Sequence, residues 1–400
     1  MKSQRNANEK NNAYKLPMFY GFDWTLVFVV FVILVFGLVM LYSASSYSAQ
    51  SEGSASYAYV LKQLFPIGLG IVFMFIITFI PHSFWKKISV FVYIIGLIAV
   101  LLVKTPLGVS LNGASRWLRI GPLSVQPAEI LKIGVILIMA YLICKWMKKI
   151  NNIKYVILVA AFDFIAAGAI VLITDDLGTA IIVFAMGLIM LIASNVKARY
   201  ILLLVGIVVA AAVIFMVSEP YRMDRVNAWL NIEAYADSDG FQVLQGLYAI
   251  GSGGLFGKGL GKSTQKLGYV PESQSDMIFT IICEELGIIG GIVLIILIVL
   301  LIWRMKKIYD ESRNLYSKVV VAGVAGHIAV QTIINLCVVT NLIPNTGVPL
   351  PFISYGGTAV MLQLVEIGLV LSVARQNELE ELENLQFVRK PEYGYRRGNY

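Results

Sequence analysis

Long apolar stretches recur along this chain of 400 residues, separated by polar connections. A helix of ~20 apolar residues spans the hydrocarbon core of a bilayer. Ten stretches approach that length, near 24–42, 60–80, 88–103, 127–144, 155–173, 177–193, 200–217, 277–303, 318–340 and 354–374. We divide the run 155–193 at Asp175 and Asp176, because adjacent carboxylates at the middle of a bilayer are costly. The pattern predicts an all-α polytopic membrane protein with ten transmembrane helices.

Composition supports this class. Apolar residues make up 58% of the chain and charged residues only 14%, against about 25% in soluble domains. This excludes a disordered, collagen-like or disulfide-stapled chain and argues against a soluble enzyme. With two histidines and three cysteines outside any CxxC pattern, a His-based zinc site and a redox motif are not expected. The net charge of +8 fits basic loops beside anionic lipid, and we expect no nucleic-acid partner.

Lysine and arginine fall in alternate connections, which sets the orientation. They occupy the N-terminal tail and the connections around 86–87, 145–154, 197–199 and 304–313, so both termini are expected in the cytoplasm. The outer side then receives 43–59, 104–126, 174–176, 218–275 and 341–353. The expected organisation is a cytoplasmic tail (1–20), a transmembrane domain (21–375) with a large extracellular loop (218–275), and a second cytoplasmic tail (376–400).

The extracellular loop 218–275 is too long for a simple connection. Its run 241–250 has apolar residues at helical spacing, which predicts a re-entrant or interfacial helix. A glycine-rich run follows, ending in Gly261, Lys262 and Ser263. It is no nucleotide-binding phosphate loop, since Phe256 stands where that motif needs glycine. Three lysines in and after this run could bind a diphosphate, or could belong to a flexible basic loop: Lys258, Lys262 and Lys266.

Several carboxylates and cations lie at or inside the predicted spans. Asp276, at the outer mouth of the eighth span, either caps that helix or acts as a partly desolvated general base. Deeper in the same span, Glu284 and Glu285 point about 100° apart, so at least one faces protein or water. The pair Glu129 and Lys132, three residues apart, favours a structural ion pair.

Two outer connections carry further candidates. Arg116 and Arg119 could bind diphosphate oxygens, or could anchor the interface together with Trp117. The run 345–357 contains Gly347, Pro349 and Pro351, and predicts a rigid external loop that enters the last helix at Ser354.

Five motifs occur in an order that resembles one family. They are NGASRWLRIGPLSVQPAEILK, DDLGTA, GFQVLQGLYAIGSGGLFGKGLGKS, YVPESQSDMIFTIICEELG and TGVPLPFISYGG. Together they resemble the SEDS family (shape, elongation, division and sporulation), which includes FtsW and RodA, over residues 20–375. The glycine-rich loop is more similar to FtsW and its sporulation relatives than to RodA.

The resemblance implies a ten-span peptidoglycan glycosyltransferase in the bacterial cell membrane, with its active site outside. Its substrate would be lipid II, and its partners a class B penicillin-binding protein, other division proteins and membrane lipid. The essential acid of the family motif PExHTDFIF corresponds to Asp276, although Gln274, Ser275 and Met277 depart from that motif. Among the candidate substrate-binding residues, the resemblance implies Arg116, Glu129 and Lys132. The other candidates are Gln242, Lys258, Lys262, Lys266 and Ser354.

The chemistry expected from this resemblance is inverting transfer, in which Asp276 deprotonates the acceptor 4-hydroxyl. Group transfer needs no cofactor, while a divalent cation (Mg²⁺ or Mn²⁺) could assist the leaving diphosphate. A lipid II flippase is the main competing hypothesis, with Lys62, Glu129, Lys132 and Glu366 lining a path. The sequence also leaves open an elongation or sporulation polymerase, and a scaffold that only positions a penicillin-binding protein.

Overall fold

A computed structural model describes residues 20–388, apart from 112–113, 121–122, 218–219 and 239. Within these ranges the chain is predominantly helical. The helices are α2 (Trp24–Ser51), α3 (Ala58–Thr78), α4 (His82–Leu102), α5 (Pro127–Trp146), η1 (Met147–Lys149), α6 (Ile153–Thr174), α7 (Leu177–Ala193), α8 (Ala198–Val217), α9 (Pro220–Leu230), α10 (Phe241–Gly253), α11 (Ile278–Glu311), α12 (Leu315–Val339) and α13 (Gly357–Val388).

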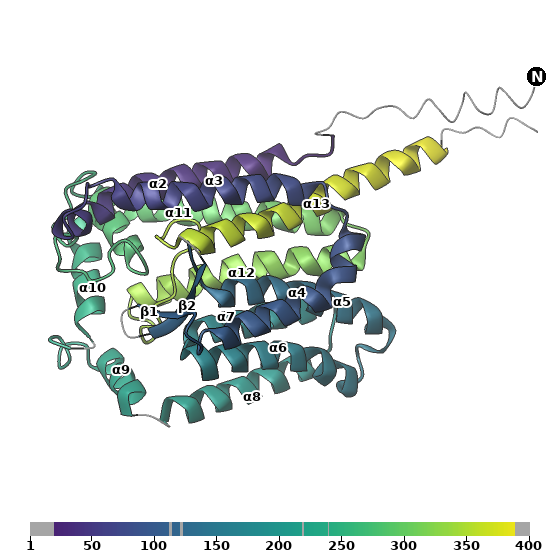
Figure 1. Cartoon of the computed structure of the whole chain (residues 1–400), viewed down its shortest axis with the longest axis horizontal. Helices are drawn as coiled ribbons and strands as arrows, with labels where there is room; N and C mark the ends of the chain where they lie inside the picture. Colours follow the sequence, from purple (N-terminus) through teal and green to yellow (C-terminus); the bar gives the residue numbers. More distant parts are fainter. Residues whose placement is uncertain (1–19, 112–113, 121–122, 218–219, 239, 389–400) are drawn as a thin grey trace, which may run out of the picture.

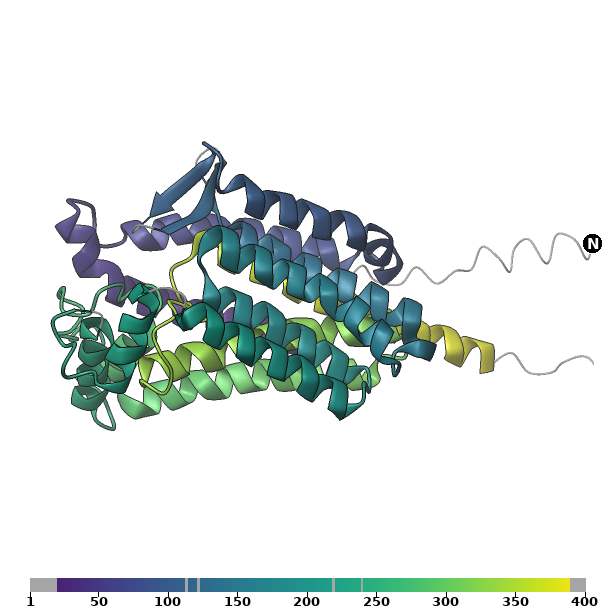
Figure 2. The same cartoon turned by 90° about the horizontal axis from the view of Figure 1, so that it is seen from below.

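Each of the ten predicted apolar stretches forms a helix, and these helices run along the long axis of one bundle (Figures 1 and 2). Nine of those described are long and apolar enough to cross a membrane. The tenth, α7, has 17 residues and falls just short of that length. The all-α polytopic prediction is therefore confirmed, while a count of ten crossings stays a prediction. The last helix continues past residue 375, the predicted end of the transmembrane domain.

One end of the bundle carries the long connections, and the other carries the two ends of the described chain. Figure 1 shows β1, β2, α9 and α10 at the left, whereas the start of α2 and the end of α13 lie at the right. The residues 1–19 and 389–400 of the predicted tails lie outside the described residues. Placing both chain ends together is what an even number of crossings would produce. We call the left end the loop end.

A small antiparallel sheet at the loop end was missed by the all-α prediction. Its strands are β1 (Gly108–Leu111), β2 (Ala114–Ile120) and β3 (Leu123–Val125), in the order β1-β2-β3. Val109 pairs with Trp117, and Leu118 pairs with Val125. Strands of three to seven residues are too short to show a clear alternation, so the pattern of 104–126 resembled an irregular loop.

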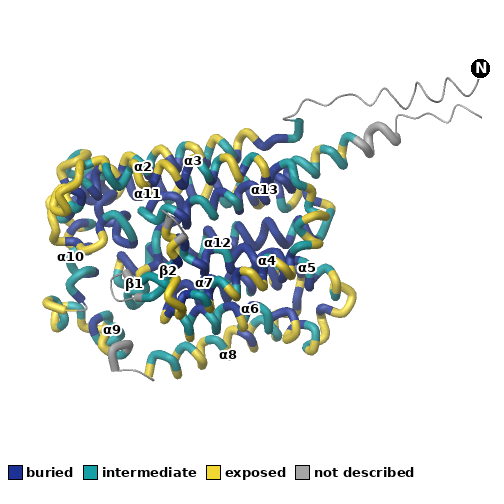
Figure 3. Tube along the Cα trace, viewed as in Figure 1, coloured by how far each residue is buried: buried dark blue, intermediate teal, exposed yellow. Residues whose placement is uncertain are grey.

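Burial follows the arrangement of the helices. In Figure 3, α12 at the centre is mostly buried, while outer helices show exposed stripes. The extreme case is α8, in which Leu204 is the one buried residue among those described. Apart from Arg199 in the first turn, its exposed side chains are apolar, as expected where lipid replaces water as the solvent.

Candidate active site

Asp276 lies at the loop end, directly before α11, and three elements meet around it. The residue is only 7% exposed. From α10, the amide Nε2 of Gln242 donates to the two carboxylate oxygens at 3.3 and 3.4 Å. The amide of Asn345, after α12, donates to Gln242 Oε1 at 3.0 Å. The two candidates Asp276 and Gln242 are therefore in direct contact.

The backbone around Asp276 is fixed from behind. Asn335 of α12 donates from one amide nitrogen to the carbonyls of Asp276 (2.7 Å) and Val348 (2.9 Å). The hydroxyl of Ser354 donates to Ser275 O at 2.7 Å and accepts from the amide of Leu350 at 2.8 Å. Ser354 is itself buried, so the structure gives it a supporting position; its role as a substrate ligand stays a prediction.

Asn335 was not among the residues predicted from the sequence. The one indication in the sequence was an asparagine inside an apolar span. Polar side chains within spans form hydrogen bonds with other parts of the protein, so such a residue points to a contact with another segment.

The helix-cap interpretation of Asp276 is wrong. The N-cap position of α11 is Met277, and no side chain caps it. Instead, the side-chain amide of Gln242 donates to the carboxylate of Asp276, and that of Asn335 donates to its backbone carbonyl. The carboxylate of Asp276 therefore does not cap the start of α11.

The surroundings of Asp276 change its acidity. Burial raises the pKa of its carboxyl to about 7, and the negative charge of Glu272 acts in the same direction. Hydrogen bonds from Gln242 and from the backbone amides of Asp276 and Met277 oppose this rise in pKa. A carboxyl whose pKa lies near neutrality can accept a proton from a substrate hydroxyl and release it again, which suits a general base.

Arg116 joins the small sheet to the turn between α6 and α7. Its guanidinium donates to the carbonyls of Thr174 (3.3 Å) and Asp175 (3.0 Å), and lies 3.4 Å from a carboxylate oxygen of Asp176. Asp176 in turn caps α7 by accepting from the amide of Thr179. Arg116 keeps about a fifth of its side chain exposed at the loop end, and its binding of diphosphate stays a prediction.

Glu129 and Lys132 form the expected ion pair at 2.6 Å, buried inside the bundle. The pair belongs to a longer chain of contacts. Lys132 Nζ lies 2.8 Å from His327 Nε2, and His327 Nδ1 lies 2.7 Å from Glu366 Oε2. Gln331 accepts from Lys132 at 3.2 Å. These residues are 1–4% exposed, so their partners are one another; substrate contact by Glu129 or Lys132 stays a prediction.

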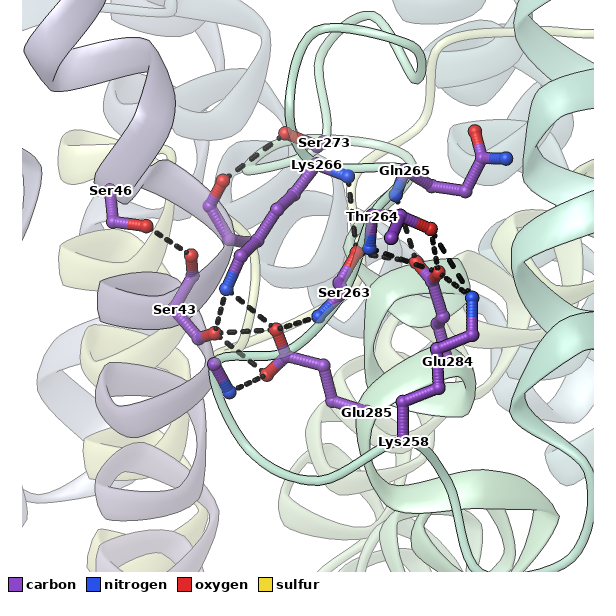
Figure 4. A network of polar contacts seen from close by, with 12 residues as sticks. Ser43, Ser46, Lys258, Ser263, Thr264, Gln265, Lys266, Ser273, Glu284 and Glu285 are labelled. Atoms are coloured by element: carbon purple, nitrogen blue, oxygen red, sulfur yellow. Dashed lines mark hydrogen bonds and ion pairs between the residues drawn. The ribbon is translucent and has the colours of Figure 1, made fainter.

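The glycine-rich loop is not free. Figure 4 shows it bound to the two adjacent carboxylates of α11. Glu284 accepts from Lys258 Nζ (2.6 Å), from the Ser263 hydroxyl and from the Thr264 hydroxyl (2.9 Å). We call the contacts of the segment 258–266 with Glu284 and Glu285 the carboxylate clamp.

The second carboxylate also reaches α2. Glu285 accepts from Lys266 Nζ (2.8 Å), from the amide of Gly261 (2.9 Å) and from the hydroxyl of Ser43 in α2 (2.7 Å). Lys266 itself is only 5% exposed. Both carboxylates therefore face protein, and together they connect α2, α11 and the segment 258–266 at the loop end.

Backbone contacts extend the clamp. The helix α11 is interrupted at Gly287, which has φ 71° and ψ −173°. The carbonyl of Glu284 accepts from the amide of Lys258 at 2.9 Å, and the amide of Ile288 donates to the carbonyl of Gly254 at 2.9 Å. A Cβ on Gly257 would lie 2.2 Å from the carbonyl oxygen of Glu285, so only glycine permits this approach.

These contacts change how the three candidate lysines are interpreted. Lys258 and Lys266 are already paired with Glu284 and Glu285. Lys262 is exposed at the loop end. Substrate binding by all three stays a prediction, but the geometry favours Lys262 as the loop lysine that can reach a ligand. The interpretation of this run as a flexible basic loop does not fit the clamp.

Within the described residues, no group of three or more His, Cys, Asp or Glu side chains is arranged to hold a metal ion. Protein-only cages are not the usual way to hold Mg²⁺, which is often bound by one or two carboxylates together with substrate phosphates. Assistance by a divalent cation therefore stays an expectation.

Comparison with known proteins agrees with the fold. The model of the FtsW, RodA and SpoVE family, described as "Cell cycle protein", matches residues 23–379. The fold and this match together define a polytopic membrane protein of that class. The chain belongs to the FtsW, RodA and SpoVE family, as the five motifs indicated.

Two curated relatives match over nearly their whole length. Stage V sporulation protein E of Bacillus subtilis is 36% identical over 354 residues, which cover 88% of this chain and 97% of the relative. The probable peptidoglycan glycosyltransferase FtsW of Coxiella burnetii is 32% identical over 373 residues, covering 91% of this chain and 99% of the relative.

Solved structures share the fold. A chain from a study titled "Structural coordination of polymerization and crosslinking by a peptidoglycan synthase complex" has a TM-score of 0.73 at 27% identity, covering 89% of this chain and 98% of that chain. The rod shape determining protein RodA of Thermus thermophilus has a TM-score of 0.65 at 27% identity, covering 90% of this chain and 99% of that chain.

The carboxylate clamp predicts that two lysine variants differ strongly in their free energy of unfolding. In Lys266→Met, Glu285 stays buried without its cation, which should lower the free energy of unfolding by roughly 3–5 kcal/mol. The control is Lys306→Met, which removes an exposed pair with Asp310 and should cost about 1 kcal/mol or less. Thermal unfolding in detergent measures both effects. Equal melting temperatures for the two variants would contradict a structural role for the clamp.

Proposed function

We propose that this protein is a peptidoglycan glycosyltransferase, which polymerises lipid II on the outer face of the bacterial cell membrane. The observation that carries the proposal is the carboxyl of Asp276. It is buried at the loop end beside Gln242, and its pKa is raised to about 7. Relatives named as probable peptidoglycan glycosyltransferases, which align over almost the whole chain, support the substrate class.

In the proposed reaction, Asp276 takes the proton from the 4-hydroxyl of the acceptor N-acetylglucosamine. That oxygen attacks the anomeric carbon of the growing strand, and the bond from this carbon to the polyprenyl diphosphate breaks. The electron pair leaves with the diphosphate, so an α-linked diphosphate becomes a β-1,4 glycosidic bond. Attack opposite to the leaving group accounts for the inversion.

The leaving diphosphate needs positive charge or hydrogen-bond donors as it departs. Two cations at the loop end are proposed for this role: Arg116, which is partly exposed, and Lys262, which is exposed. Arg116 pairs with Asp176, the residue before α7. The start of α7 packs against the connection that follows α12, since a Cβ on Gly178 would lie 3.0 Å from Thr346 Cβ. The residue after Thr346 is Gly347, and a Cβ there would lie 3.9 Å from Asp276 Oδ2. Arg116 and Asp276 thus border one region of the loop end.

The proposal places both termini in the cytoplasm and the loop end outside. It includes a class B penicillin-binding protein as partner, since a structural relative comes from a peptidoglycan synthase complex. Relatives named FtsW and stage V sporulation protein E support division or sporulation as the setting. A flippase gains no support from Glu129, Lys132 and Glu366, because these buried side chains contact neighbouring residues instead of lining an open path.

Asp276→Asn tests the assigned base directly. The variant keeps the size of the side chain but cannot accept the proton, so polymerisation should fall by about 10²–10⁴-fold. The measurement is glycan formation from lipid II by the purified protein with its penicillin-binding partner in liposomes. A melting temperature at or above that of the wild type would exclude misfolding as the cause. Wild-type polymerisation by this variant would remove Asp276 from the mechanism.

The environment of Asp276 also predicts a pH dependence. Because the deprotonated carboxylate is the active form, the rate should rise with pH around a midpoint set by its pKa of about 7. Glu272→Gln removes a charge that raises the pKa, so its midpoint should move to lower pH. Gln242→Leu removes a donor to the carboxylate, so its midpoint should move to higher pH. Initial rates across pH measure this, and shifts in one common direction would contradict the assignment.

A further inference from the structure

A cavity of about 250 Å³ lies at the loop end, next to the candidate base but outside the bundle of long helices. Its walls come from α9, from α10, from the connection between them, from the connection that follows α12 and from Pro271. Besides Phe241 and smaller apolar residues, its lining includes one indole and five polar side chains: Trp229, Arg225, Ser238, Gln242, Asn341 and Asn345. Neither the five motifs nor the proposed chemistry at Asp276 accounts for this set, apart from Gln242.

The lining has the chemistry of a sugar-binding site. An indole offers a flat apolar face to the C–H groups of a pyranose ring, and Trp229 is partly exposed. Three amides and a hydroxyl provide donors and acceptors for ring hydroxyls and for an acetamido group. Among the described residues of the wall, Arg225 alone is charged, whereas a diphosphate would require several cations. The composition therefore favours a neutral, hydroxylated ligand.

The walls are held in place before any ligand binds. The indole N–H of Trp229 donates to the carbonyl of Asn341 at 3.0 Å. Arg225 donates to the carbonyl of Asn345 at 3.4 Å. Asn341 has φ 56°, the left-handed conformation that asparagine tolerates better than most residues. Preorganised walls reduce the entropy cost of binding a ligand.

Gln242 connects the cavity to the proposed base. It lines the cavity, accepts from Asn345, and donates to both oxygens of Asp276. A sugar in the cavity would therefore be separated from Asp276 by one side chain. The volume is slightly below the ~300–1,000 Å³ of sites for drug-sized ligands, which suits one sugar ring.

We propose that this cavity binds one N-acetylhexosamine unit of the nascent glycan, beyond the two sugars that react. The inference rests on the proposed function and adds a binding subsite to it. The reacting sugars carry the lipid anchors and must stay near the bilayer. The older part of the strand is water-soluble, and the cavity is built from α9, α10 and a connection outside the bundle (Figure 1). Holding that unit retains the strand between successive additions.

The test uses the purified full chain in detergent and chitotetraose, a β-1,4-linked N-acetylglucosamine oligomer, as the probe. Saturation-transfer NMR should detect binding to the wild type. Trp229→Ala should weaken binding roughly five- to tenfold, through loss of ring contact. Trp229→Phe keeps an aromatic face and should retain most of the binding. This variant separates a loss of the sugar site from a loss of folding.

A matched pair of asparagine variants sharpens the test. Asn341→Gly removes an amide from the cavity wall but keeps the backbone carbonyl that accepts from Trp229. Glycine also tolerates the positive φ at this position. Asn195→Gly makes the same change at φ 57°, at the end of α7 outside the cavity. We expect weaker chitotetraose binding and shorter glycan strands for Asn341→Gly, and wild-type values for Asn195→Gly.

The outcomes separate this inference from the proposed function. Chitotetraose binding by Asp276→Asn without polymer formation would support both. A wild-type protein that binds chitotetraose but makes no polymer would overturn the proposed function and leave a carbohydrate site. A wild type that polymerises lipid II but does not bind chitotetraose, or Trp229→Ala and Asn341→Gly variants with wild-type binding and strand length, would overturn the subsite.

Discussion

Two adjacent carboxylates inside an apolar helix impose the constraint on which the loop end depends. Glu284 and Glu285 are fully buried in α11, where an unpaired charge would be expensive. The segment 258–266 provides their cations and donors, and Ser43 adds a contact from α2. Satisfying these two groups fixes a long connection at the loop end against the helices. A connection that the composition alone would leave mobile thereby becomes part of the fold.

The fixed connection determines the setting of Asp276. It leads directly from the clamp into the residues before α11, while α10 brings Gln242 to the carboxylate. Asn335 and Ser354 hold the backbone on the other side. Among the described residues no cation pairs with this buried carboxyl, which agrees with the rise of its pKa toward neutrality, whereas Glu284 and Glu285 have lysine partners. One short stretch of chain thus carries two carboxylates paired with lysines and, eight residues earlier, the carboxyl proposed as the base.

Apolar length was enough to predict the helices, because a bilayer admits few alternatives to a helix. The ion pairs were harder to predict, since the sequence around a lysine in a polar loop does not show which carboxylate it contacts. Lys258 and Lys266 were candidate ligands for a diphosphate, yet they bind carboxylates of a helix that follows in the sequence. The interruption at Gly287 and the position of Asn335 likewise depend on contacts between distant segments. Asp276 and Gln242 belong to two different motifs, and their direct contact is also one between separate segments.

The central claim is that the loop end, with Asp276, faces the outside of the cell. It can be tested by labelling single cysteines with a membrane-impermeant maleimide in right-side-out vesicles, after the three native cysteines are replaced. Ser252, exposed on α10, and Lys197, exposed after α7 at the opposite end, are suitable positions. The account predicts that Ser252→Cys is labelled in intact vesicles and Lys197→Cys only after permeabilisation. The reverse pattern would place the carboxylate in the cytoplasm and contradict the proposed polymerase.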